Sequence, residues 1–149
     1  DIRLLEVLEA MGCVVNRDSD RVSVSGGPLT GVDVDMGAMP DMVPTLAAVA
    51  LFAEGKTTIR NVGHLRFKES DRLNAVTVEW RKLGARVEEF EDSLVVHGGQ
   101  RLSGAKVDPH DDHRLAMSLA VVGLKVPGVR IQNPACVNKS FPQFWDLWK

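Results

Sequence analysis

Near the start of the chain, apolar residues recur at the spacing of one helix face, at positions 4, 5, 8 and 11. This spacing predicts an amphipathic helix, and Gly12 is suited to end it in a left-handed conformation. Two short apolar runs, 14–15 and 22–24, enclose polar residues 16–20, which is typical of a β-hairpin. The break at Gly26-Gly27-Pro28 separates this hairpin from a strand predicted over 32–35.

The same kinds of pattern continue to the end of the chain. They predict a helix over 44–53, a strand over 57–61, a helix over 70–83, a hairpin over 85–97, a strand near 107, a helix over 112–124, a strand over 129–132 and a short helix over 141–148. Two helical stretches, 46–53 and 115–122, are apolar almost all round, so we expect them to be buried. The predicted fold class is therefore α/β, with buried helices and sheets outside them.

The second half of the chain repeats the first. Gly12 recurs as Gly84, 72 positions later, and other residues keep this offset or one of 73. The matching residues include Val15 and Val87, Asp20 and Asp92, Gly26-Gly27 and Gly98-Gly99, Gly31 and Gly104, Val34-Asp35 and Val107-Asp108, and Asn61 and Asn133. Collinear glycines and aspartates indicate a duplication. We expect one partial domain over 1–149, with repeats over roughly 1–72 and 73–144 and room for a third.

Composition narrows the class of protein. The 149 residues are 44% hydrophobic and 26% charged, the balance of a soluble globular domain. The net charge of −2 gives no global basic field, so nucleic acid and anionic membranes are not expected partners. The longest apolar run is too short to span a bilayer. The chain begins at Asp1 inside an amphipathic pattern, so we expect it to be a piece of a longer protein, and no targeting signal can be read in it.

The numbers and spacing of cysteine and histidine residues indicate the redox environment of the protein and whether it could bind a metal ion. Cys13 and Cys136 have no metal-type spacing and fit a reducing, cytoplasmic environment better than a disulfide scaffold. His110 and His113 could bind zinc from one helix face, but no cysteine or third histidine lies near them in the sequence. We therefore predict no metal site.

Two clusters of candidate functional residues precede predicted helices in the first half. Asp41 follows Met39-Pro40 and is either an N-cap or a general base. The run Arg66–Arg72 contains Ser70 as a possible N-cap, with its charges as a solvated first turn. Arg72 nevertheless opposes the helix dipole, which makes sense if an anion docks at the same helix end.

Two further clusters lie in the second half. Arg114, within Asp111–Arg114, is again a cation at the start of a buried helix, and a structural salt bridge to Asp111 or Asp112 is the alternative. Lys139 precedes the last helix and by itself means little, because exposed lysines are common. Taken together, Lys68, Arg72, Arg114 and Lys139, with Asp41, Glu69 and His113 among them, predict a site for a multiply charged anion such as phosphate or carboxylate. The chain has no P-loop, G-x-G-x-x-G or G-x-S-x-G motif to support a nucleotide or hydrolase site.

Four stretches resemble the 5-enolpyruvylshikimate-3-phosphate synthase family along essentially the whole chain. They are Asp35-Met36-Gly37-Ala38-Met39-Pro40-Asp41, Asn61-Val62 through Lys68-Glu69-Ser70-Asp71-Arg72, Asp112-His113-Arg114-Leu115-Ala116-Met117, and Cys136-Val137-Asn138-Lys139-Ser140-Phe141-Pro142. The combination of K-E-S-D-R with D-H-R-x-A-M is specific to this family. His64 departs from it, because some members have an Asn there that touches the shikimate substrate.

The resemblance implies a fold, a reaction and partners. Family members have two domains of three β-α-β-α-β-β units, with the active site between them, so two of three units of the C-terminal domain are expected here. They transfer the carboxyvinyl group of phosphoenolpyruvate to the 5-hydroxyl of shikimate 3-phosphate and release phosphate, without a cofactor. The remainder of the same enzyme, across the cleft, is then the partner, and the fragment alone should be inactive.

The resemblance also implies roles for individual residues. Asp41 resembles the base for the 5-hydroxyl proton, and Glu69 the carboxyl group implicated in proton transfer at the phosphoenolpyruvate carbons. Lys68 resembles the lysine that contacts shikimate 3-phosphate. The cations that hold phosphoenolpyruvate correspond to Arg72, Arg114 and Lys139. The residue beside these cations corresponds to His113.

Two alternatives stay open at this point. A UDP-N-acetylglucosamine enolpyruvyl transferase has the same fold, but it does not share this pair of motifs. A noncatalytic anion-binding module could also retain the fold, although such a module has no need of Asp41 and Glu69.

Overall fold

The computed structural model describes residues 1–148. The helices are α1 (Leu4–Met11), α2 (Val43–Ala50), α3 (Arg72–Lys82), α4 (His113–Gly123) and α5 (Phe144–Leu147), with 3₁₀ helices η1 (Pro40–Met42), η2 (Gly63–Phe67) and η3 (Pro134–Lys139). The strands are β1 (Val14–Arg17), β2 (Val22–Ser25), β3 (Asp33–Asp35), β4 (Lys56–Arg60), β5 (Arg86–Glu89), β6 (Leu94–His97), β7 (Lys106–Val107) and β8 (Arg130–Ile131). Each predicted helix and strand is present, with ends shifted by up to three residues.

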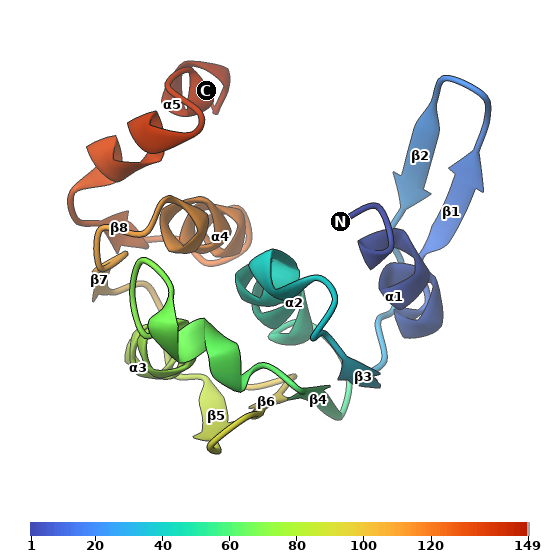
Figure 1. The fold of residues 1–149 in the computed structure, drawn as a ribbon, viewed down its shortest axis with the longest axis horizontal. Helices are drawn as coiled ribbons and strands as arrows, with labels where there is room; N and C mark the ends of the chain where they lie inside the picture. Colours follow the sequence, from blue (N-terminus) through green and yellow to red (C-terminus); the bar gives the residue numbers. More distant parts are fainter. Residues whose placement is uncertain (149) are drawn as a thin grey trace.

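The strands form three separate sheets. The four-stranded sheet has the order β3-β4-β6-β5, in which β3 and β4 are parallel and the other neighbours antiparallel. In its register Ile59 lies opposite both Val34 and Leu94, and Ile59 and Leu94 are fully buried. The hairpin β1-β2 and the parallel pair β7-β8 are the other two sheets. Figure 1 shows the four-stranded sheet along one side of α2 and α3.

The core lies between the helices and the inner face of this sheet. Helix α2 buries six of its eight residues, and α4 packs beside it (Figure 1). Trp80 of α3 is fully buried, and its indole Nε1 donates a hydrogen bond to the Ala47 carbonyl of α2 at 3.2 Å. The predicted α/β fold class, with buried helices and outer sheets, is thus confirmed.

The two halves have equivalent features at equivalent positions. The parallel pair β3-β4 corresponds to β7-β8. Gly12 and Gly84 end helices with φ of 113° and 91°, and Asn61 and Asn133 both have positive φ. These correspondences support the duplication, which stays a prediction.

Three local expectations differ from the structure. Helix α2 ends at Ala50 rather than residue 53, because Phe52 and Ala53 donate to carbonyls three positions back and tighten the last turn. The three 3₁₀ helices were not predicted, since such short segments leave little periodicity to detect. Ser70 is not the N-cap of α3: Asp71 accepts the Asn74 amide instead. Within residues 1–148 no helix is long and apolar enough to cross a bilayer.

Candidate active site

The charged residues of the candidate site come from four separate connections. Asp41 lies in η1 just before α2, and Glu69 lies between η2 and α3. Arg72 and Arg114 occupy the first turns of α3 and α4, and Lys139 ends η3. Because α2, α3 and α4 pack together (Figure 1), these connections meet at one end of the helical core.

Arg72 is the centre of the cluster. Its side chain is 1% exposed, and it donates to three carboxylates. Nε contacts Asp112 Oδ2 at 2.6 Å, Nη1 contacts Asp41 Oδ1 at 2.9 Å, and Nη2 contacts Glu69 Oε2 at 2.8 Å. Burial alone would lower the pKa of Arg72, but the hydrogen bonds and charges of these carboxylates outweigh burial and raise it. Arg72 therefore stays charged and organises acids from three segments.

Asp41 joins two cations. Its second oxygen, Oδ2, lies 3.1 Å from Arg114 Nη2, so the carboxylate bridges Arg72 and Arg114. The interpretation of Asp41 as an N-cap is wrong, because no side chain caps η1 or α2. The alternative for Arg114, a side-chain salt bridge to Asp111 or Asp112, is likewise wrong, because Arg114 pairs with Asp41 instead. Asp41 and Arg114 remain 35% and 30% exposed, so solvent or a ligand can reach both.

Glu69 is a second bridge, at the exposed edge of the cluster. Its Oε1 lies 3.5 Å from Lys139 Nζ, while Oε2 binds Arg72. A hydrogen bond from its own backbone N–H, followed by the charges of Arg72 and Lys139, lowers the pKa of Glu69. Glu69 is therefore a carboxylate at neutral pH in this arrangement, and it would have to exchange partners and take up a proton before donating one.

Asp112 holds the start of α4 against α3. It is fully buried, its Oδ1 accepts the Arg114 amide at 3.0 Å, and its Oδ2 accepts from Arg72 and from the Ser70 hydroxyl. Asp112 is thus the N-cap of α4 and also links the K-E-S-D-R and D-H-R sequences. From the sequence, Asp112 was expected only as a possible salt-bridge partner of Arg114. Its position directly before His113-Arg114 was the available signal for a larger role.

Two predicted residues border the network without joining it. Lys68 is exposed, and its ammonium has no hydrogen-bond or ion-pair partner among residues 1–148. His113 is 6% exposed, and its buried Nδ1 has no partner there either. Buried polar atoms are seldom left unpaired, so a hydrogen-bonding ligand beside the start of α4 would suit His113.

The cluster is chemically suited to small anions. Three carboxylates balance Arg72, Arg114 and Lys139, and Lys68 adds one uncompensated positive charge beside them. An anion that displaced a carboxylate from Arg114 or Lys139 would gain charge-assisted hydrogen bonds and would release an acid or base. Within the described part of the chain, no group of three or more His, Cys, Asp or Glu side chains could hold a metal ion.

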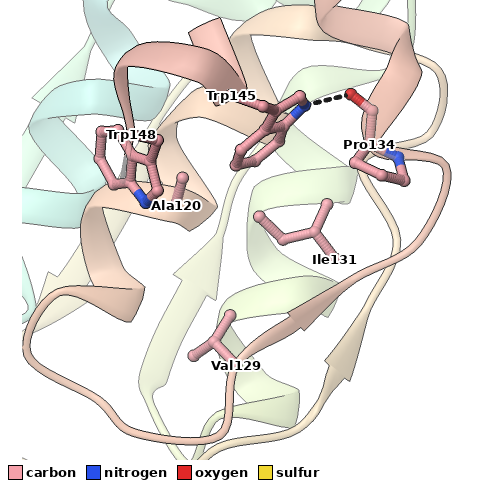
Figure 2. A pocket seen from close by; sticks show the side chains of 6 residues that line it. All are labelled: Ala120, Val129, Ile131, Pro134, Trp145 and Trp148. Atoms are coloured by element: carbon pink, nitrogen blue, oxygen red, sulfur yellow. Dashed lines mark hydrogen bonds between the residues drawn. The ribbon is translucent and has the colours of Figure 1, made fainter.

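A hollow near the C-terminal end differs in character from the charged cluster. Figure 2 shows it lined by Ala120, Val129, Ile131, Pro134, Trp145 and Trp148, with the Trp145 indole donating to the Pro134 carbonyl at 2.7 Å. None of these side chains carries a charge. The hollow therefore does not suit the multiply charged anion that the cluster around Arg72 would bind.

Comparison with known proteins gives the family of the chain. The family model for EPSP synthase (3-phosphoshikimate 1-carboxyvinyltransferase) matches residues 1–148. The chain belongs to the EPSP synthase family. Relatives named 3-phosphoshikimate 1-carboxyvinyltransferase from Syntrophobacter fumaroxidans and Methanoculleus marisnigri are 53% and 51% identical over 100% and 98% of the chain.

Solved structures give the same result for the fold. The EPSP synthase from Acinetobacter baumannii has a TM-score of 0.90 at 27% identity and covers 97% of this chain. The enolpyruvyl transferase NikO from Streptomyces tendae also covers 97% of it, with a TM-score of 0.75 at 26% identity. The chain spans only 36% and 35% of the two curated relatives and 37% of the Acinetobacter protein.

Proposed function

We propose that the complete protein transfers the carboxyvinyl group of phosphoenolpyruvate to the 5-hydroxyl of shikimate 3-phosphate, in the cytoplasm, and releases phosphate. The observation that carries this proposal is the network around Arg72, which gathers Asp41, Glu69 and Asp112 from three segments. A site that only bound anions would gain nothing from three acids beside its cations. The relatives' printed name, 3-phosphoshikimate 1-carboxyvinyltransferase, supplies the acceptor and the group that is transferred.

The proposed roles follow the chemistry of the reaction. Asp41 removes the proton of the 5-hydroxyl as the oxygen adds to C2 of phosphoenolpyruvate. A proton is added to C3, and phosphate leaves the tetrahedral intermediate as C3 is deprotonated again; Glu69 takes part in these transfers. General acids and bases of this kind contribute roughly 10² to 10⁴ in rate.

The cations have two proposed roles: one holds the acids of the site in place, and the others bind the substrates. Arg72 is almost fully enclosed by carboxylates, so it holds the acids in place and offers ligand contacts only as Asp41 or Glu69 moves. Arg114 and Lys139, 30% and 58% exposed, are the accessible cations for the carboxylate and phosphate of phosphoenolpyruvate, with His113 next to them. Lys68 is available for shikimate 3-phosphate. Fixed cations stabilise charge that develops in the transition state.

The rest of the protein completes the site in this proposal. The chain covers about a third of the length of its relatives, and we propose that the cradle of side chains for the shikimate ring lies outside it. We assign that cradle to the remainder of the same enzyme, across a cleft. The proposed reaction needs no metal or organic cofactor.

Phosphate release by the complete protein tests this proposal. We expect turnover when phosphoenolpyruvate is mixed with shikimate 3-phosphate, and none when UDP-N-acetylglucosamine is the acceptor. Turnover with the nucleotide sugar would indicate the other enolpyruvyl transfer. Binding of phosphoenolpyruvate without turnover of either acceptor would indicate a noncatalytic anion-binding module.

A further inference from the structure

Glu79, on α3, is a buried acid outside the network around Arg72. Its side chain is 1% exposed. Oε2 accepts the Asp108 amide at 2.9 Å and lies 2.8 Å from Lys82 Nζ, and Oε1 lies 2.9 Å from His110 Nε2. A buried carboxylate is tolerated only when such partners compensate its lost hydration. Two of the three partners belong to the connection between β7 and α4, which we call the 108–112 loop.

The 108–112 loop has an unfavourable backbone conformation. His110 and Asp111 are consecutive non-glycine residues with φ of 53° and 56°. The Asp108 carboxylate accepts the His110 amide at 2.7 Å, and the Asp112 amide donates to the Pro109 carbonyl at 2.9 Å. Left-handed conformations of this kind persist only where surrounding contacts enforce them. The Glu79 carboxylate provides two of those contacts.

This loop leads directly into candidate site residues. Asp112, His113 and Arg114 follow the two left-handed residues without interruption. Arg72 lies on the same helix as Glu79, seven positions or about two turns earlier, and it binds Asp112. Helix α3 therefore holds the 108–112 loop at two points: Glu79 holds its beginning and Arg72 its end.

We infer that Glu79 is a positioning residue for the active site, which fixes the 108–112 loop and through it the start of α4 and Arg114. This inference rests on the proposed function, because it assigns Arg114 to the binding of phosphoenolpyruvate. Within residues 1–148, Glu79 makes no hydrogen bond or ion pair with a residue that we assign to the substrates. Its loss lets His110 and Asp111 relax and moves Arg114 relative to Asp41 and Glu69.

The test compares three variants of the complete enzyme. Glu79→Gln removes the charge while keeping the side-chain volume. His110→Asn removes one loop contact but retains a residue that tolerates the left-handed conformation. The matched control is Glu88→Gln, which breaks another Glu–His pair, Glu88 with His97, on β5 and β6 away from the site.

Two measurements are made on each variant. We expect Glu79→Gln to lower kcat/KM for phosphoenolpyruvate by roughly tenfold to a hundredfold, the scale of a small misplacement of a binding group, with a smaller change in KM for shikimate 3-phosphate. His110→Asn shifts kcat/KM for phosphoenolpyruvate and KM for shikimate 3-phosphate in the same direction as Glu79→Gln, by smaller factors. Backbone amide exchange of the segment 108–114 speeds up in both variants, and Glu88→Gln leaves both measurements unchanged. Adding Glu79→Gln to an Arg114→Ala enzyme should cost less than adding it to the wild type.

The outcomes separate this inference from the proposed function. Unchanged exchange at 108–114 in Glu79→Gln, or in His110→Asn if Glu79→Gln does not fold, overturns it. So does faster exchange with unaltered kinetics in an active enzyme, or equal losses on both Arg114 backgrounds. A wild-type enzyme without turnover contradicts the proposed function, while exchange at 108–114 still decides whether Glu79 holds the loop.

Discussion

Arg72 and Arg114 carry the same charge in different surroundings. Arg72 is 1% exposed and binds three carboxylates, one of which, Asp112, is itself fully buried. Arg114 is 30% exposed and binds one. A buried charge that loses its partner is far more costly than an exposed one, so the two arginines should respond differently to truncation.

Arg72→Ala should reduce stability, and Arg114→Ala should reduce affinity. Without Arg72, Asp112 keeps a buried charge, so we expect a loss of about 3–5 kcal/mol. Arg114→Ala should cost less than about 1 kcal/mol in stability and should weaken phosphoenolpyruvate binding roughly 10- to 150-fold, by a charge-assisted contact. Denaturant unfolding and separate ligand titrations measure these effects. Equal stability losses in the two variants would contradict the difference in burial.

Asp41→Asn should abolish a proton transfer without unfolding the protein. The side chain is 35% exposed, so an amide of equal size fits there, and we expect kcat of the complete enzyme to fall by roughly 10² or more. The matched control is Asp33→Asn, which breaks a surface pair with Arg60 away from the site. If turnover of Asp41→Asn stayed near that of the wild type, Asp41 would not be the base.

Glu69 makes the stability of the protein depend on pH. Its pKa in the folded protein lies below the ordinary value of 4.5, so the carboxylate favours the folded state at neutral pH. That contribution is lost as the pH falls below 4.5 and through the folded-state pKa. We therefore expect Tm of the wild type to exceed that of Glu69→Gln near pH 7, and the difference to shrink toward about pH 3. A difference that stayed constant over this range would exclude Glu69 as its source.

At the scale of elements, two glycines let strands and turns approach closely. A Cβ on Gly31 would lie 2.1 Å from the Lys56 carbonyl oxygen, and one on Gly104 would lie 2.4 Å from the Pro127 carbonyl oxygen. The two glycines are equivalent in the predicted duplication. A close approach to backbone atoms at both positions supports that prediction.

Alanine at either glycine should destabilise the fold. Because each clash is with backbone, the two backbone segments must separate, and we expect Gly31→Ala and Gly104→Ala each to cost about 1–3 kcal/mol. Gly27→Ala is the matched control, since its added Cβ would meet no atom within 4 Å. Denaturant midpoints of the three variants provide the comparison. An effect of Gly27→Ala as large as the other two would rule out the close approach as the cause.

At the scale of the whole molecule, the described residues supply acids and cations on one side of the proposed substrates. The candidate site has exposed edges at Asp41, Glu69 and Lys139, and solvent weakens every ion pair there. Catalysis requires water to be excluded and both substrates to be oriented. The remainder of the protein is the proposed source of both.

Residues 1–149 alone should therefore show no turnover. We expect the isolated chain to fold, to bind phosphoenolpyruvate with a Kd of about 1 mM or weaker, and to release no phosphate at saturating substrates. Release of phosphate and calorimetric titration are the measurements. Turnover approaching roughly 10 s⁻¹ would show that the site is complete within this chain, and sedimentation would then decide whether self-association completes it.

The sequence by itself determined the elements and the identity of the charged residues. Helices and strands were predictable because their periodicity is local, as in residues 4–11 and 113–123. The charged residues were identifiable because K-E-S-D-R and D-H-R are contiguous in the sequence. The contacts of Arg72 were not predictable, since Asp41 and Asp112 lie 31 and 40 positions from it and reach it only when α2, α3 and α4 pack together. The same packing made Asp41 a bridge rather than a cap, and it enclosed Glu79, whose place on α3 gave no sign of its hold on the 108–112 loop. Local patterns fix backbone conformation, whereas tertiary packing decides which charges meet and how far water is excluded from them.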